Sequence, residues 1–131
     1  MAIDYGSRRI GIAVSESGLL ATPYSVLANE GDVVETLAGL ARKLEASTIV
    51  VGIPRRRFRD RSETKFHDFA ERLRQRTCKE VVLWDEALTT VDAAERLRSA
   101  GRKRREAEQE IDMAAAAVIL QSYLDAQRRQ S

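Results

Sequence analysis

The sequence is poor in the residues that build disulfides, zinc sites and aromatic binding platforms. Its 131 residues include one cysteine, Cys78, and one histidine, His67, and its aromatic fraction is only 5%. One cysteine excludes an intrachain disulfide and fits a reducing compartment, and the two residues together cannot form the cluster that binds zinc. So few aromatic rings also disfavour a stacking platform for single-stranded bases. We expect His67 on the solvent side of its helix and Cys78 as a small packing residue near a helix end.

Long hydrophobic runs are also missing. The longest uncharged apolar run, residues 113–120, is too short to cross a bilayer. We see no signal peptide, so the cytoplasm is the expected location. The length predicts a single domain spanning residues 1–131, and the hydrophobic fraction of 44% is enough for one core.

The net charge of +2 conceals two concentrated basic segments, residues 55–61 and 102–105. A charge run is most often a solvated surface, but patches of this density suit a polyanionic partner better than a membrane. Arginine matches phosphate oxygens with its planar fork, and a turn near the start of the chain supplies two more arginines. We therefore predict a nucleic-acid partner that is bound by Arg8, Arg9, Arg55, Arg56, Arg57, Arg59, Arg61, Arg102, Lys103, Arg104 and Arg105.

The hydrophobic pattern predicts the element order βββαβαβαα, which is an α/β mixed five-stranded sheet flanked by helices. The expected strands are 1–5, 10–15, 22–27, 48–53 and 81–84. Four helices are expected: one that begins near Asp32, one that begins at Ser62 or Thr64, and two that span 91–99 and 108–127. Residues 55–61 are expected to form a loop, and residues 102–105 a connection. Ligands of such sheets bind beyond the carboxyl ends of parallel strands, where residues 52–54 and 85–86 are expected.

Acidic residues stand at three informative places. Asp4 lies inside an otherwise apolar strand, where an acid is costly unless it is paired or liganded. Asp85 and Glu86 follow an apolar strand, and alternation lets only one of them face a site. Asp112 directly precedes eight apolar residues.

Each acid also has an ordinary explanation. Asp4 could accept hydrogen bonds at a strand end, and one of the pair Asp85 and Glu86 could simply be solvated. Asp112 could be a first-turn acid that the helix dipole favours. Against that last explanation, three glutamates just before it already supply the charge; they are Glu106, Glu108 and Glu110.

Three carboxylates in one place would repel one another unless a cation joins them. Two carboxylates about 4 Å apart repel by roughly 4 kcal/mol at an effective dielectric near 20. A divalent cation between the carboxylates replaces this repulsion with attraction. Because Mg²⁺ and Mn²⁺ prefer oxygen ligands, either is the expected cofactor. Such sites cleave phosphodiester bonds. The same repulsion predicts that neither Asp4→Asn nor Asp112→Asn destabilises the metal-free protein.

Four ordered segments carry a family resemblance: Asp4–Ser15 (DYGSRRIGIAVS), Val50–Pro54 (VVGIP), Asp85–Thr90 (DEALTT) and Asp112–Tyr123 (DMAAAAVILQSY). The chain resembles the YqgF family, also called the RuvX or pre-16S rRNA nuclease family, which is related to the Holliday junction resolvase RuvC. The resemblance implies an RNase H-like fold with Asp4, Glu86 and Asp112 as the catalytic and metal-binding carboxylates. It also implies a bacterial nuclease, endonuclease or exonuclease, that trims the 5′ end of pre-16S rRNA during ribosome biogenesis.

Other functions stay open at this point. A Holliday junction resolvase acting on four-way DNA would use the same acids and work as a dimer, so a monomer and a homodimer are both expected possibilities. A sugar kinase or actin-like ATPase shares the Asp-x-Gly hairpin but needs a second domain. A non-catalytic nucleic-acid-binding accessory factor is the third alternative, because Ala87 stands where the family often has arginine.

Overall fold

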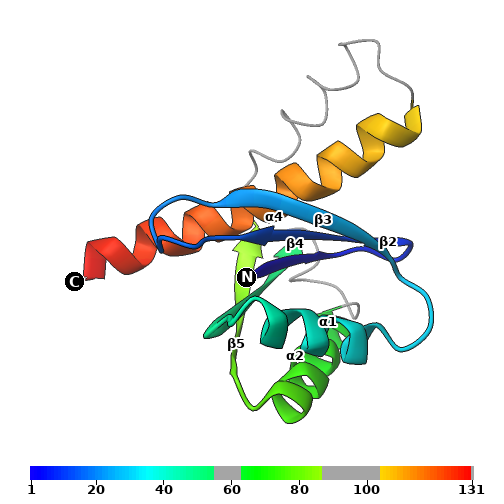
Figure 1. Ribbon diagram of the computed structural model, residues 1–131, viewed down its shortest axis with the longest axis horizontal. Helices are drawn as coiled ribbons and strands as arrows, with labels where there is room; N and C mark the ends of the chain where they lie inside the picture. The colour runs from blue at the N-terminus through cyan, green and yellow to red at the C-terminus, as the bar shows by residue number, and fades with distance from the viewer. Residues whose placement is uncertain (55–62, 87–103, 131) are drawn as a thin grey trace.

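The structure, a computed structural model, describes residues 1–54, 63–86 and 104–130 (Figure 1). Five strands form one mixed sheet in the order β3-β2-β1-β4-β5. The strands are β1 (Ala2–Tyr5), β2 (Arg9–Val14), β3 (Thr22–Ala28), β4 (Thr48–Pro54) and β5 (Glu80–Glu86). The first three form an antiparallel meander, whereas β4 runs parallel to both β1 and β5. The predicted mixed five-stranded sheet is confirmed.

Helices cover both faces of this sheet (Figure 1). Helix α1 (Val33–Lys43) and helix α2 (Glu63–Thr77) lie on one face, and the long helix α4 (Arg104–Gln130) crosses the other. Alternating strand positions supply the two cores. Ile3 and Val51 pack on the side of α1 and α2, whereas Ala2 and Val50 pack against α4.

Helix α1 forms where the capping pattern predicts it. The Asp32 side chain accepts a hydrogen bond from the Glu35 backbone N–H at 3.2 Å, which satisfies one of the free donors of the first turn. The helix ends at Leu44, and Glu45 follows with a φ of 54°. Its apolar face and the predicted inner face of α2 are both buried; these residues are Val33, Val34, Leu37, Ala41, Phe66, Phe69, Ala70 and Leu73.

Helix α4 packs very closely on the sheet because small residues stand on both sides of the contact. Ala115 and Ala116 of the helix are fully covered. On the sheet, a Cβ at Gly52 would overlap the Ile119 side chain, coming within 2.8 Å of Cγ1. At Gly11, a Cβ would overlap the carbonyl oxygen of Asp112 and lie 3.2 Å from its Cα. Glycines in β2 and β4, the two strands that flank β1, therefore set how near α4 comes.

Several boundaries differ from the sequence expectations. Strand β5 runs on through Asp85 and Glu86, because β4 stays paired with it as far as the register pair of Pro54 and Glu86. Helix α4 begins at Arg104 rather than at residue 108, because the intervening residues are good helix formers, so Arg104 and Arg105 are helical. Thr64 lies inside α2. The expected helix 91–99 lies outside the described residues.

The two isolated side chains, one histidine and one cysteine, have different outcomes. His67 is exposed on α2, as predicted. Cys78 is exposed too, so its predicted packing role is wrong. Its φ of 56° is the left-handed conformation that commonly ends a helix, and its backbone N–H donates to the Arg74 carbonyl at 2.9 Å. Within the described ranges, no helix combines the length and hydropathy that crossing a membrane requires.

Candidate active site

Asp4 lies at the carboxyl end of the central strand with a glycine on each side. Its register partner is Gly11 in β2 and Gly52 in β4. Cross-strand partners project to the same side of a sheet, and Asp4 has the same alternation as Ala2, which packs against α4. The half-buried Asp4 carboxylate therefore shares its side of the sheet with α4, and no side chain stands in the flanking register positions.

Asp112 meets this same place from the helix. Its backbone rests directly on Gly11, the cross-strand partner of Asp4. Because α4 starts at Arg104, Asp112 lies about two turns inside the helix and not in its first turn. The ordinary explanation of Asp112 as a first-turn acid is therefore excluded. Two acids separated by more than one hundred residues are brought to one side of the sheet.

Arg9 supplies a counter-ion that the sequence analysis did not foresee. Its Nε donates a hydrogen bond to Oδ2 of Asp112 at 2.7 Å, and the two side chains are 35% and 19% exposed. Arg9 opens β2 two residues before Gly11, so the strand delivers the guanidinium to the same face. The predicted phosphate-binding Arg9 is thus bound to one of the predicted catalytic acids.

Glu86 is the last residue of β5. The register pairs it with Pro54, two positions beyond the pair formed by Gly52 and Trp84. The Trp84 indole lies against α4, where its Nε1 donates to Oγ of Ser122 at 3.0 Å. Because β1, β4 and β5 are parallel, their carboxyl ends share one edge, and the backbone of Glu86 lies at that edge. The Glu86 side chain lies outside the described residues.

Among the side chains that the structure describes, no three acids, histidines or cysteines cluster as a metal site. The described side chains include those of Asp4 and Asp112 but not that of Glu86. The described part of the candidate site therefore consists of two carboxylates with one arginine bound to the second. The proposed three-acid site remains a prediction.

A rigid turn presents the N-terminal arginines. The Gly6 N–H donates to the Arg9 carbonyl at 3.1 Å, and the Asn29 side chain donates to the Gly6 carbonyl at 2.8 Å. The Asn29 backbone N–H adds a bond of 2.8 Å to the Arg8 carbonyl. Arg8 itself is exposed at the tip of this turn. It remains a candidate for phosphate contact beside Asp4.

The other predicted basic residues lie largely beyond what the structure describes. The segment 55–61 and residues Arg102 and Lys103 are outside the described ranges. Arg104 and Arg105 form the first positions of α4, about two turns before Asp112. Nucleic-acid binding by these residues stays a prediction.

Lys65 is a candidate that the sequence analysis missed. Its Nζ lies 5.3 Å from the Tyr5 ring centroid and 5.9 Å from that of Phe66, within cation–π range. Tyr5 directly follows Asp4 and stacks on Phe69 with the ring centroids 4.0 Å apart. A lone lysine in a polar helix resembles ordinary solvated surface. The useful signal is its position in the first turn of the helix that follows β4, at the edge where the acids lie.

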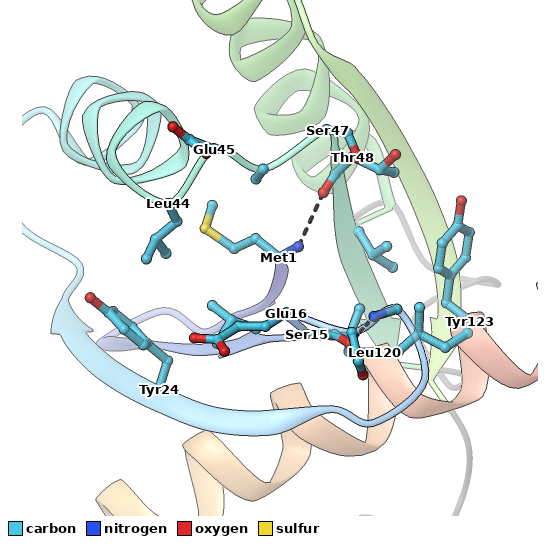
Figure 2. Close-up of a pocket in the computed structure, with 16 residues that line it drawn as sticks. Met1, Ser15, Glu16, Tyr24, Leu44, Glu45, Ser47, Thr48, Leu120 and Tyr123 are labelled. Carbon is cyan, nitrogen blue, oxygen red and sulfur yellow. Dashed lines mark hydrogen bonds between the residues drawn. The ribbon is translucent and has the colours of Figure 1, made fainter.

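A cavity of about 650 Å³ lies at the opposite end of the parallel strands (Figure 2). Its lining combines the amino ends of β1 and β4 with Leu120 and Tyr123 of α4. The Met1 amine donates to the Thr48 carbonyl at 3.1 Å, and burial lowers the pKa of this amine. Burial, followed by the charge of Glu80, raises the pKa of the Tyr123 phenol. Neither Asp4 nor Asp112 lines this cavity, so the candidate site is distinct from it and lies at the other end of the parallel strands.

The mixed sheet, the helices on both faces and the acids at the carboxyl edge define an α/β protein of the RNase H-like class. The chain belongs to the RuvX Holliday junction resolvase family, whose model matches residues 1–126.

Two relatives illustrate the similarity. A protein of Mycolicibacterium smegmatis is 41% identical over 138 residues, covering 98% of this chain and 81% of its own length. A protein of Mycobacterium tuberculosis is 42% identical over 132 residues, covering 95% and 77%. Both are named "Putative pre-16S rRNA nuclease".

Proposed function

We propose that this chain is a metal-dependent nuclease that processes the 5′ end of pre-16S rRNA in the cytoplasm. Asp4, Glu86 and Asp112 are the carboxylates that we assign to the reaction. The observation that supports the proposal most directly is the packing of the Asp112 backbone on Gly11, which is the cross-strand partner of Asp4. Asp112, two turns inside a close-packed helix, is thereby carried to the same side of the sheet as Asp4, where carboxylate oxygens from both could bind one cation.

The donors fit a hard divalent cation. Asp4 and Asp112 offer carboxylate oxygens, which suit Mg²⁺ or Mn²⁺ rather than zinc or copper. The glycines that flank Asp4 let α4 lie close to the sheet, with the Asp112 backbone over Gly11, so the helix carries the second carboxylate to the side of the sheet where Asp4 lies. Bound there, such a cation would stabilise the charge that develops on phosphate during hydrolysis and would activate water.

The chain's own residues would position the substrate around these acids. Asp4 holds its place through the central strand, and Asp112 holds its place through helix packing, so both are carried by rigid elements. Arg8, exposed in the turn after β1, would contact phosphate oxygens, and so would Lys65, which lies against Tyr5 at the carboxyl end of β1 on the face that α2 covers. The arginines of segment 55–61 would extend this contact along the strand of nucleic acid.

RNA is the substrate that the relatives' names favour. The family description names a Holliday junction resolvase instead, which keeps four-way DNA as the second candidate. Both polymers present the same phosphates to the basic residues, so charge alone does not separate them. A dimer in solution would favour the resolvase, because symmetric cleavage needs two active sites.

A cleavage panel tests the proposal. The purified chain would be incubated with structured RNA, single-stranded RNA and four-way DNA, each with Mg²⁺ and with Mn²⁺. We expect metal-dependent cleavage of structured RNA that Asp4→Asn lowers by at least about 100-fold, since losing even an indirect metal partner costs about 10–100-fold. The matched control is Asp125→Asn, an acid near the far end of α4. Nucleic-acid binding without cleavage under either metal would instead make the chain an accessory factor.

A further inference from the structure

The pairing of Arg9 with Asp112 raises a question that the proposed chemistry does not answer. Asp112 is a proposed cation ligand, yet one of its oxygens already accepts a charge-assisted hydrogen bond of 2.7 Å. A guanidinium cannot shed its proton near neutral pH. It therefore keeps its full positive charge beside any cation that the same carboxylate would hold.

Both partners are held in place by the fold. Arg9 belongs to β2, and its backbone carbonyl accepts from the Gly6 N–H across the preceding turn. The backbone of Asp112 is pressed on Gly11, two residues along the same strand. The contact is thus built by the packing of α4 on β2. The Asp112 side chain is 19% exposed and the Arg9 side chain is 35% exposed, so solvent reaches both partners.

We infer that Arg9 is an exchangeable counter-ion, which neutralises Asp112 in the metal-free protein and yields it to the divalent cation. Like charges cannot share one carboxylate without mutual repulsion, so cation binding moves the guanidinium away. The displaced guanidinium lies at the edge where phosphate would bind. Arg9 is thereby a positioning residue that links metal occupancy to substrate affinity. The inference rests on the proposed metal site.

This exchange would couple the binding of the cation to the binding of nucleic acid. If a cation frees Arg9 for phosphate, then the cation raises nucleic-acid affinity, and nucleic acid raises cation affinity by the same factor. An arginine that only orients Asp112 would act differently. Its loss would loosen the carboxylate and weaken cation binding. The sign of the effect of removing Arg9 therefore separates the two roles.

Direct titration with Mn²⁺ tests the inference without any cleavage readout. Free Mn²⁺ would be measured by electron paramagnetic resonance for the wild type, Arg9→Gln and Arg8→Gln. Arg8 is the matched control, because it removes one positive charge from the neighbouring position without touching Asp112. We expect Arg9→Gln to bind Mn²⁺ about tenfold more tightly than the wild type. Arg8→Gln should change the affinity by less than about twofold, as expected for an exposed charge. Weaker binding by Arg9→Gln, or equal changes in both variants, would overturn the inference.

A second variant and a second readout complete the test. Arg9→Lys keeps the charge but lacks the Nε donor, so its Mn²⁺ affinity should fall between those of the wild type and Arg9→Gln. If Arg9→Gln does not fold, the Mn²⁺ affinity of Arg9→Lys is compared with that of the wild type instead, and it should be higher. Non-cleavable RNA would then be titrated with and without Ca²⁺, and the gain in affinity should be several-fold smaller for Arg9→Gln. Equal gains would also overturn the inference.

These results are separable from those of the cleavage panel. Tighter Mn²⁺ binding by Arg9→Gln in a protein that cuts nothing would support the exchange and refute the nuclease. Metal-dependent cleavage with no change in Mn²⁺ affinity would support the nuclease and refute the exchange.

Discussion

Asp112 joins the packing of the molecule to its proposed chemistry. Its backbone fills the space that Gly11 leaves open, and its side chain binds Arg9. From the sequence alone, Asp112 is expected to carry an uncompensated charge in the metal-free protein. The ion pair changes that expectation, because removing the charge of Asp112 now also removes a partner of Arg9.

We predict that Asp112→Asn abolishes cleavage and also destabilises the metal-free protein slightly. The cost should be about 0.5–1 kcal/mol, a range reduced for screening because Arg9 is 35% exposed. Urea unfolding in a chelator would measure it, and a double-mutant cycle with Arg9→Gln would isolate the pair. The control is Glu71→Gln, whose partner Arg74 is 41% exposed and which should cost less. A more stable Asp112→Asn would mean that repulsion outweighs the ion pair.

The sequence predicted a candidate site residue only where an acidic side chain stood in an otherwise apolar segment. Asp4 in an apolar strand and Asp112 before an apolar run were both recognisable. The partner of Asp112 was not, because the contact with Arg9 joins residues 103 positions apart and depends on how α4 lies on β2. Lys65 was not identified from the sequence for the same reason, since its position beside Tyr5 depends on how α2 packs against β1.

Helix α4 is the element on which the site depends most. It brings Asp112 to the sheet only because Gly11 and Gly52 let it approach so closely. The two glycines differ in what they face. Gly52 meets the end of the flexible Ile119 side chain, which can shift, whereas Gly11 meets backbone atoms of Asp112, which cannot shift without moving the helix.

We predict that Gly11→Ala destabilises the protein by roughly 2–3 kcal/mol, the cost of forcing an atom into a packed contact. The change should also weaken Mn²⁺ binding, because α4 moves away from Asp4. Gly39→Ala is the matched control, since its Cβ would have only Arg42 Nη2, at 4.0 Å, as a near neighbour inside α1. That control should stabilise by about 0.5–1 kcal/mol through helix propensity. Thermal unfolding and Mn²⁺ titration of both variants would check this, and an unchanged Gly11→Ala would contradict the close contact.

Element boundaries show what local patterns can and cannot predict. The capping box at Asp32 and the buried run of β4 determined their elements correctly, because each depends on residues close in sequence. The length of β5 did not follow from its apolar run. Its last two residues are charged, and they are in the strand because β4 pairs with them. The start of α4 was placed too late because a basic run was interpreted as a connection.

At the scale of the whole molecule, the candidate site joins the beginning, middle and end of the chain. Asp4 comes from the first strand, Glu86 from the last strand and Asp112 from the final helix. The unfolded chain holds these acids far apart and cannot offer a cation the same set of ligands. Metal binding should therefore be tied to folding itself.

We predict that Mn²⁺ raises the melting temperature of the wild type and not that of Asp4→Asn. A ligand that binds only the folded state at about 100 times its dissociation constant adds about 2.7 kcal/mol, which corresponds to a rise of roughly 10 °C for a chain of this size. Asp125→Asn is the control. Hydrogen bonds from Gln121 and Arg128 lower the pKa of this acid, and it lies more than three turns beyond Asp112 on α4, so its loss should leave the Mn²⁺ shift intact.

The comparison of the two variants also locates the cation. If Asp125→Asn loses the shift and Asp4→Asn keeps it, the cation binds at the far end of α4, and the acids at the carboxyl edge do not form its site. If all three proteins shift equally, the stabilisation comes from nonspecific binding to surface acids, which added salt would screen. If the Mn²⁺-induced rise in melting temperature persists in added salt and is lost only in Asp4→Asn, the cation is bound through the Asp4 carboxylate at the end of the central strand.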